Sequence, residues 1–403
     1  MGIITLITLA NFIACKKDIV DNPNKIDYET DLQQFEVVWN GLNTAYVFWS
    51  VDTTDWDAVY EQYHAKFERM EAEPDSVWEK TWRELTSTLI DHHMTITLKR
   101  PSSSYYTITI NPGLDEQKAR SYYHERPNLF PNVHREMLNK WVNYGRLSDT
   151  VSVYHINIAY NGYFWCSYSG VLDGEIAYLY LSSFELNNAS MFDKMQAFEH
   201  FKQLVAKDGI KAAIIDVRDN PGGNPNDISY LLSCFTTEKR IEIGCSQTKL
   251  GLGRYDLTPP MPCYVYPVST GQERNIPVIV LADINSVSAA ETAVMSIRNL
   301  PQGYMVGERT YGARGTLSDD FELFYSGSFG VGGGTILGYM TLGHYIETAK
   351  WLFLDVDGTC YEGRGIEPDV ECLFDQSAWN NGVDNQLECA VEFAKNKIAE
   401  NGN

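Results

Sequence analysis

The chain has few basic residues and none of the cysteine patterns that bind metals. Its 403 residues include 32 Lys and Arg against 53 Asp and Glu, which gives a formal net charge of -21. A surface this acidic repels phosphate backbones and anionic lipid headgroups, so we expect neither nucleic-acid binding nor electrostatic attachment to a membrane. None of the eight cysteines forms a CxxC pair or a Cys/His cluster with zinc-ligand spacing, so the sequence predicts no metal site.

Motifs that mark several common enzyme classes are also missing. The sequence contains no GxSxG elbow, no GxxxxGK[ST] phosphate loop and no HExxH metal helix. Beyond the N-terminal segment, no apolar run is long enough to span a bilayer. Any chemistry must therefore come from a less general pattern.

The first 14 residues, MGIITLITLANFIA, are nearly all apolar and end at Cys15. This run is shorter than the roughly 20 residues of a transmembrane helix, but it fits the apolar core of a signal peptide. The small residue before Cys15 and the polar stretch after it resemble a bacterial lipobox. We therefore expect a signal peptide at 1–14 and a tether at 15–29, with Cys15 lipidated in the bacterial cell envelope and the lipid as the only membrane attachment. The alternative is a buried first strand.

The rest of the chain can bury a large core, because 44% of the residues are hydrophobic and 13% are aromatic. Apolar residues at helical spacing predict a domain of three helices over 30–91, and Ser76 with Glu79 predicts a capping box at the start of the third helix. We expect a mixed α/β connecting region at 92–173. From 174 to 403 strands alternate with helices, which predicts an α/β core.

Two strand-to-helix junctions in this core carry polar residues. DVRDNPGGN at 216–224 ends one continuous apolar strand, and NSVSAAE at 285–291 follows another. Sites in open α/β sheets form at the carboxyl ends of strands. A Gly-Gly turn there leaves backbone N–H groups uncovered, as an oxyanion hole requires, and a serine at a helix start can lie beside them. Each feature alone is better explained as a turn or a helix cap. Together they indicate a nucleophile with an oxyanion hole.

Four motifs resemble those of the tail-specific, or C-terminal-processing, serine peptidases. They are DVRDNPGG at 216–223, NSVSAAE at 285–291, VGERTYGARG at 306–315 and EGRGIEPDV at 362–370, in the order of the family. The resemblance is to the branch that includes tricorn core protease and the retinoid-binding-protein-like repeats. It implies a crotonase/ClpP-like α/β core. No segment resembles the PDZ domain that many members carry.

The resemblance also implies the nucleophile and the oxyanion hole. Ser288 matches the nucleophile, with Ser286 as the alternative. The backbone N–H groups of Ala289 and of Gly222 or Gly223 would form the oxyanion hole.

The base is a histidine in this resemblance. The Lys base of other members is replaced here by Ala313, and the adjacent Arg314 cannot deprotonate, which excludes a Ser–Lys dyad. His93, in LIDHH, matches the histidine of the tricorn-like branch, with His92 as the alternative. Glu362 matches the acidic partner, and we expect its carboxylate to orient the imidazole and to raise its pKa.

We therefore predict a secreted or membrane-tethered serine peptidase that hydrolyses peptide bonds through Ser288, His93 and Glu362. It would act on a peptide or protein substrate and need no metal or cofactor. The main alternative is a non-catalytic protein that binds apolar ligands or peptides on the same fold. An acyl-CoA enzyme on the crotonase fold is less consistent with secretion and with an acidic surface.

Overall fold

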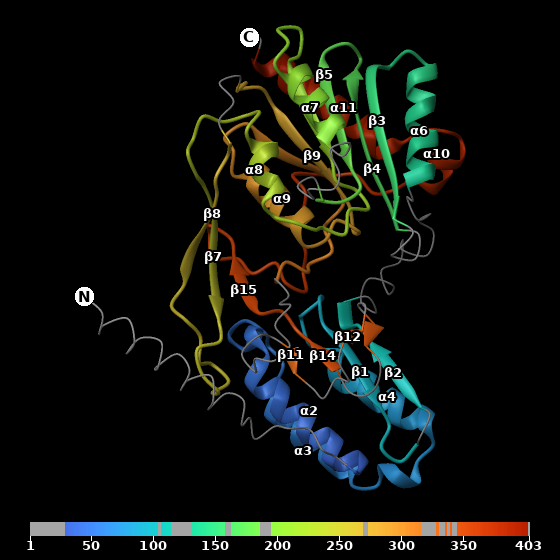
Figure 1. Ribbon diagram of the computed structural model, residues 1–403, viewed down its shortest axis with the longest axis vertical. Coiled ribbons are helices and arrows are strands. Elements are labelled where there is room, and N and C mark those ends of the chain that lie inside the picture. Colours follow the sequence, from blue (N-terminus) through green and yellow to red (C-terminus); the bar gives the residue numbers. More distant parts are fainter. Residues whose placement is uncertain are drawn as a thin grey trace, which may run out of the picture. The chain divides into compact units, whose positions relative to one another are not determined.

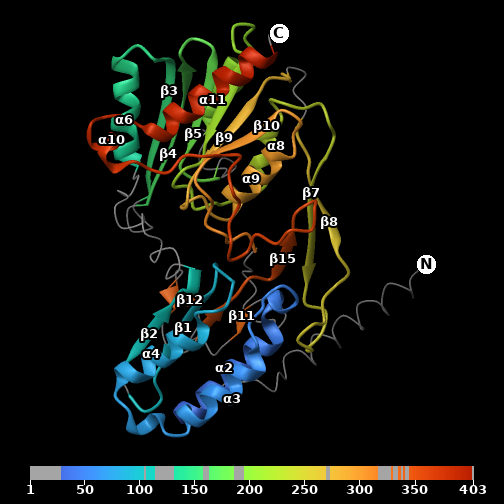
Figure 2. The same ribbon diagram turned by 180° about the vertical axis from the view of Figure 1, so that it is seen from behind.

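The computed structural model describes residues 29–103, 106–113, 131–157, 163–185, 195–268, 273–315, 328–329, 335–336, 339–340 and 345–401. The chain forms two compact units whose segments alternate along the sequence. The first unit comprises Met1–Asp115, Ser246–Met261 and Gly315–Phe353, and the second comprises Glu116–Cys245, Pro262–Arg314 and Leu354–Asn403. Figures 1 and 2 show the elements of both units from opposite sides.

The three predicted N-terminal helices are confirmed as α2 (Asp31–Ala45), α3 (Trp56–Phe67) and α4 (Asp75–Thr86), with short 3-10 turns at Val47–Ser50 and Met70–Ala72. Their aromatic faces form a core, in which the ring of Phe67 stacks on Phe35 at 4.8 Å and lies 5.0 Å from Trp82.

The predicted capping box at Ser76 is wrong. Helix α4 begins one residue earlier, at Asp75, after Pro74, whose fixed φ and missing N–H suit the position before a helix. The capping box of this region lies instead at α2, between Thr30 and Gln33.

The first unit also contains an antiparallel sheet, in the order β11-β14-β1-β2. Its strands are β1 (Thr95–Lys99), β2 (Thr107–Ile110), β11 (Ser328–Phe329) and β14 (Tyr345–Glu347), and a hairpin joins β12 (Thr335–Ile336) to β13 (Tyr339–Met340). Strand β14 pairs with β1 across about 250 residues of sequence, with Thr95 opposite Glu347. The segment Gly315–Phe353 thus belongs to the same unit as the N-terminal helices, whereas the sequence analysis assigned it to the α/β core at 174–403.

The second unit is built on a seven-stranded mixed sheet in the order β16-β10-β9-β6-β5-β4-β3. The strands are β3 (Leu147–Asn157), β4 (Tyr163–Leu172), β5 (Ile176–Leu181), β6 (Ala212–Asp216), β9 (Val278–Ala282), β10 (Gly303–Gly307) and β16 (Val370–Glu371). The five strands from β5 to β16 are parallel, and β3 and β4 are antiparallel. The predicted α/β core is confirmed, and no PDZ domain is evident in the described residues.

Helices cover both faces of this sheet. Alternate side chains of β5 point to opposite faces. Leu179 packs in the core with α7 (Met195–Val205), α8 (Asp227–Leu232) and α9 (Ala289–Arg298). Its neighbour Tyr178 packs on the other face, with α6 (Pro131–Asn143) and α11 (Asn385–Asn401). A short helix, α10 (Gln376–Asn380), precedes α11, and a separate sheet has the order β15-β7-β8, formed by Trp351–Leu354, Ile241–Thr248 and Met261–Val265.

Candidate active site

Ser288 lies at the junction of β9 and α9, in a backbone conformation that few residues other than glycine adopt. Its φ is 57° and its ψ is -114°. Such a conformation costs on the order of 1–3 kcal/mol, so the surrounding structure must hold it. The Ser288 N–H donates to the carbonyl oxygen of Ala313 at 3.0 Å and to Oε2 of Glu291 at 3.2 Å. The residue is half-buried at the N-terminus of α9, where the helix dipole favours negative charge.

The surroundings of Ser286 differ from those of Ser288. Ser286 is fully buried. Its hydroxyl donates to the carbonyl oxygen of Val217 at 2.7 Å and accepts from the N–H of Asp283 at 3.0 Å. A hydroxyl held by two buried backbone groups is poorly placed to attack a substrate. The geometry therefore favours Ser288 as the nucleophile.

Hydrogen bonds join the two motif loops into one platform at the ends of the neighbouring strands β6 and β9. The Asp219 N–H donates to both carboxylate oxygens of Asp283 at 3.1 Å. Asn285 Nδ2 donates to Asp219 Oδ1 at 2.9 Å, and the Val287 N–H donates to the carbonyl oxygen of Asn220 at 2.9 Å. The glycine loop and the serine loop are thus fixed against each other.

The two glycines of DVRDNPGG are required for this close packing. A Cβ on Gly222 would lie 2.7 Å from Cβ of Ser288 and 2.9 Å from the nitrogen of Ala289. A Cβ on Gly223 would lie 2.1 Å from the carbonyl oxygen of Phe184. Both glycines also have positive φ, of 102° and 129°, so no larger residue fits either position without displacement.

The predicted oxyanion donors are not equivalent. The Gly222 N–H donates to Oδ1 of Asn220 at 2.9 Å and is therefore engaged. In the described part of the chain, the N–H groups of Gly223 and Ala289 have no hydrogen-bond acceptor. Ala289 is the first residue of α9, where backbone N–H groups lack partners within the helix. Gly223 and Ala289 are thus the available donors, and Gly222 provides the close approach.

Glu291 holds the VGERTYGARG segment against the start of α9. It is fully buried, and its Oε1 accepts from Thr310 Oγ1 at 2.7 Å and from the Gly312 N–H at 2.8 Å. Its Oε2 accepts from the N–H groups of Ala313 and Ser288, at 2.8 and 3.2 Å. Burial raises the pKa of Glu291, and these hydrogen bonds oppose the shift. The arrangement is that of a supporting residue and not of a reacting one.

Glu362 lies beside the same segment. Its Oε2 accepts from the Arg314 N–H at 2.9 Å, and the side chain is buried. Arg314 follows Ala313, whose carbonyl oxygen accepts from the Ser288 N–H. Ser288 and Glu362 therefore bind adjacent residues of one segment of the second unit.

His93 belongs to the first unit, where a turn holds it. Oδ1 of the fully buried Asp91 accepts from the His93 N–H at 3.0 Å. The other carboxylate oxygen of Asp91 accepts from Thr348 Oγ1 and, at 2.8 Å, from the Ala349 N–H. The ring Nδ1 of His93 is buried and has no hydrogen-bond partner among the residues that the structure describes. Because His93 and Ser288 belong to different units, their pairing remains a prediction.

The pKa of His93 differs from the sequence-based expectation. It is lowered to about 4, chiefly by burial and to a smaller extent by the charge of His92, while a hydrogen bond to the backbone of Gly315 opposes the shift. We expected the carboxylate of Glu362 to raise this pKa. The correction follows from desolvation, because a buried ring loses the water that stabilises its charged form.

Sequence reasoning did not find the ionic cluster that anchors the glycine loop. Arg218 is fully buried and donates to Asp216 Oδ2 at 2.7 Å and to both oxygens of Asp384 at 2.8 Å. Tyr178 adds a hydrogen bond to Asp216 Oδ2 at 2.9 Å. Asp384 lies 166 residues from Arg218, so no local pattern could have shown the partnership.

The described residues contain no group of three or more His, Cys, Asp and Glu side chains that could hold a metal ion. Within the second unit, the groups available for chemistry are the hydroxyl of Ser288, the N–H groups of Gly223 and Ala289, and the buried carboxylate of Glu362.

Comparisons with known proteins bear on the family and the fold of this chain. The model of peptidase family S41 matches residues 175–372, which include all four motifs. The crystal structure of a suspected peptidase from Parabacteroides merdae is 24% identical, with a TM-score of 0.62 over 90% of this chain and 96% of that one. Mature CPAF in complex with lactacystin is 12% identical, with a TM-score of 0.58 over 92% and 99% of the chains, and mature CPAF alone has a TM-score of 0.56 at 12% identity over 93% and 98%. No curated protein matches the sequence. The structural likenesses show a shared fold over most of the chain, and the family match supports a serine-type peptidase.

Proposed function

The core at residues 175–372 belongs to peptidase family S41, and we propose that the protein cleaves peptide bonds with Ser288 as its nucleophile. The observation that carries this proposal is the backbone of Ser288. A strained, half-buried serine lies at a helix N-terminus, in the same platform as two N–H groups that have no acceptor among the described residues. Strain of this kind concentrates at functional sites.

In this proposal, Ser288 Oγ attacks the carbonyl carbon of the scissile bond while His93 takes the hydroxyl proton. The N–H groups of Ala289 and Gly223 donate to the developing oxyanion. The imidazolium then protonates the leaving amine, which leaves an acyl-enzyme. Water, deprotonated by the same imidazole, hydrolyses the ester and restores the serine. Glu362 orients the imidazole.

The neutral state of His93 supports its role as the base. With its pKa lowered to about 4 by burial, the imidazole is unprotonated at neutral pH and can accept a proton. The position that holds the Lys base in other members of the family is occupied here by Ala313, which is fully buried. His92 is the alternative base.

We also propose that the protein is secreted and tethered to the bacterial cell envelope by a lipid on Cys15. The apolar run that ends at this cysteine is the support for the proposal. Cys15 and the tether up to residue 28 lie outside the described residues. None of the described helices is both long and apolar enough to cross a membrane.

The test is labelling of the full-length protein with a fluorophosphonate, followed by mass spectrometry to find the modified residue. We expect the label on Ser288, and we expect Ser288→Ala to abolish both labelling and peptide hydrolysis. Adding His93→Ala to Ser288→Ala should reduce residual activity little further, because members of a catalytic unit act together. Ser286→Ala is the matched control and should keep the label at Ser288. A label on Ser286, or no label on the folded wild type, would contradict the proposal, and the second result would favour the non-catalytic binding protein.

A further inference from the structure

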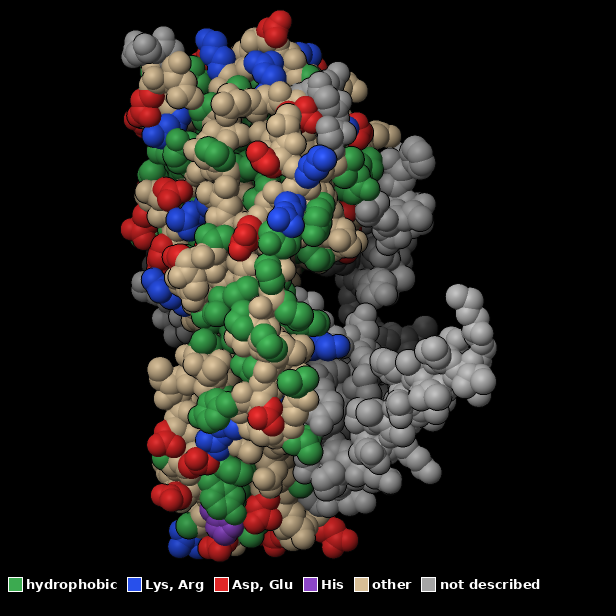
Figure 3. Space-filling view, turned by 90° about the vertical axis from the view of Figure 1, so that its left-hand side faces the viewer, with side chains coloured by type: hydrophobic (Ala, Val, Ile, Leu, Met, Phe, Trp, Pro, Cys, Tyr) green, Lys and Arg blue, Asp and Glu red, His purple; other side chains and the backbone are tan. Residues whose placement is uncertain are grey.

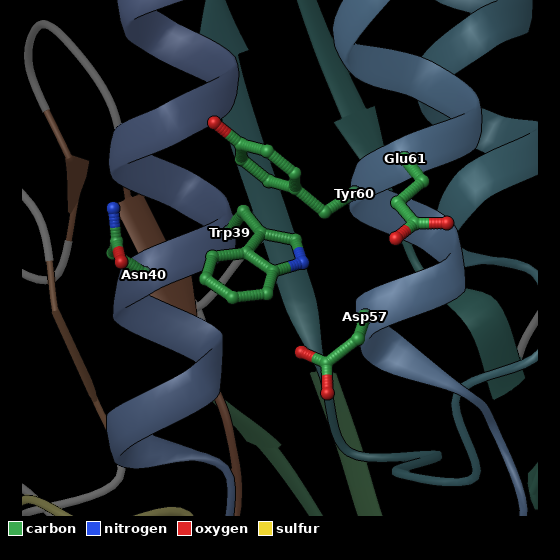
Figure 4. Close-up of a pocket in the computed structure, with 5 residues that line it drawn as sticks. All are labelled: Trp39, Asn40, Asp57, Tyr60 and Glu61. Atoms are coloured by element: carbon green, nitrogen blue, oxygen red, sulfur yellow. The ribbon is translucent and has the colours of Figure 1, made fainter.

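The first unit contains a pocket between helices α2 and α3. Its volume is about 280 Å³, and its lining residues are Trp39, Asn40, Asp57, Tyr60 and Glu61. Figure 4 shows the rings of Trp39 and Tyr60 between the two helices, with the carboxylates of Asp57 and Glu61 on the α3 side. Pockets for whole small molecules measure about 300–1,000 Å³, so this one suits a single long side chain.

The aromatic wall of the α2–α3 pocket is held in place before any ligand binds. Trp39 Nε1 donates to the carbonyl oxygen of Trp56 at 2.8 Å, and Trp56 Nε1 donates to that of Trp39 at 3.1 Å. The two indole rings are parallel, with centroids 6.4 Å apart, and the Tyr60 ring meets Trp39 edge-on at 4.9 Å. A ligand that stacks on Trp39 and Tyr60 would therefore bind without the entropic cost of fixing these side chains.

The two carboxylates of the pocket differ in what they bind. Asp57 and Glu61 lie one turn apart on α3, and both are exposed. Asp57 accepts two hydrogen bonds from Arg254, at 2.6 and 3.1 Å. Within the described ranges, Glu61 has no hydrogen-bond or ion-pair partner. Acidic side chains also predominate at the lower end of the face in Figure 3, at the level of α2 and α3, so the field there favours a cation.

Arg254 shows that a guanidinium group can pack against the aromatic residues next to this pocket. Its guanidinium carbon lies 6.0 Å from the centroid of Trp39 and 5.6 Å from that of Trp49. Its Nε donates to Oδ1 of Asn43 at 2.7 Å, while Asp57 binds its terminal nitrogens. One guanidinium of the chain's own thus already rests between aromatic rings and a carboxylate at this site.

We propose that the α2–α3 pocket binds the side chain of an arginine in a peptide. The aliphatic stem would lie along Trp39 and Tyr60, and the guanidinium would pair with Glu61. Arginine suits this site better than lysine because its planar group stacks on aromatic rings and pairs with a carboxylate in two places. That the peptide is a substrate rests on the proposed function, whereas the binding itself does not.

The experiment titrates N-acetylarginine amide into the full-length Ser288→Ala variant, followed by the indole N–H signals of the tryptophans in NMR. N-acetylcitrulline amide, which has nearly the same shape without the charge, is the comparison ligand. We expect saturable binding of the arginine probe, at least about 5-fold weaker binding of citrulline, and affinity that falls as salt is added.

Matched variants locate the site. Glu61→Gln should weaken arginine binding by roughly 2- to 5-fold, whereas Glu71→Gln, an equal charge change on the exposed Met70–Ala72 turn, should not. Tyr60→Leu should weaken it by a similar roughly 2- to 5-fold, whereas Tyr60→Phe, which keeps the ring, should not. Equal binding of citrulline, equal effects of the two glutamine variants, or no saturable binding would overturn the proposal. Because Ser288→Ala cannot turn over substrate, none of these results bears on whether the wild type is a peptidase.

Discussion

At the scale of single residues, the burial of His93 decides how its imidazole behaves with pH. A free histidine has a pKa of about 6.5, and burial lowers that of His93 to about 4. Its neutral form therefore persists well into the acidic range. The same shift makes it a weaker base, because a group of low pKa accepts a proton less readily.

In the proposed mechanism His93 is the base, so its pKa would set the acid limb of the pH–rate profile. We expect kcat/KM for a peptide substrate to fall only below pH 6.5, at a pH approaching 4, because activity is lost when the imidazole is protonated. The measurement is a pH–rate profile for wild type and His92→Ala. Removing His92 takes away a positive neighbour that lowers the pKa, so the limb should move slightly upward. A wild-type limb at or above pH 6.5 would show that His93 is not the base in this environment.

A direct comparison of the two histidines assigns the role. His93→Ala should abolish hydrolysis, and His92→Ala should retain it. The reverse result would make His92 the base.

At the scale of elements, the site depends on how loops after neighbouring strands are fixed. The glycine loop after β6 is anchored by the buried cluster of Asp216, Arg218 and Asp384, and the cluster also joins this loop to the start of α11. Burial and two carboxylates act on Arg218 together, and its pKa is raised well above the usual value although burial alone would lower it. Arg218 is therefore charged in the folded protein.

Breaking this cluster should destabilise the second unit. Arg218→Met leaves two buried carboxylates without their counter-charge, so we expect the free energy of unfolding to fall by about 3–5 kcal/mol. The free energy of unfolding of the variant and of the wild type is measured by urea denaturation. The triple variant Arg218→Met, Asp216→Asn, Asp384→Asn removes all three charges and should recover a substantial part of the loss. A single variant as stable as wild type would show that the cluster is not needed for stability.

What the sequence could predict at this scale follows from local periodicity. The apolar faces around Phe35 and Trp82 predicted two of the three N-terminal helices, and the continuous apolar run at 276–282 predicted the buried strand that is observed as β9 (Val278–Ala282). Long-range pairs left no such signal. Strand β14 has only three residues and no alternation to identify it as the partner of β1. For the same reason the sequence indicated Ser288 but not its φ of 57°, which depends on contacts with remote segments.

At the scale of the whole molecule, the proposed lipid anchor controls where the protein acts. The polar tether expected at 15–29 would keep the folded units in the aqueous phase while the lipid holds the chain at the membrane. A single acyl chain binds membranes only weakly and reversibly, so stable anchoring requires the several chains of a bacterial lipoprotein.

Replacing the acceptor tests this arrangement. We expect the wild type to partition into detergent and Cys15→Ser to appear in the soluble fraction with unchanged peptide hydrolysis. Detergent phase separation measures whether the protein partitions with the detergent, and the intact mass shows whether a lipid is attached. A wild type that is soluble, with residues 1–14 still attached, would refute the anchor.

The unusual backbone of Ser288 also implies a trade-off between durability and chemistry. Ser288→Gly and Ser288→Ala both lack the hydroxyl, but only glycine tolerates the positive φ without strain. The glycine variant should therefore be more stable to denaturant than the alanine variant by about 1 kcal/mol, although we expect both variants to be inactive. It should equal or exceed the wild type as well, because glycine in place of a helix-cap serine costs only a few tenths of a kcal/mol. The single substitution Ser288→Gly would then give a protein at least as stable as the wild type, and its expected loss of activity would explain why serine occupies the position.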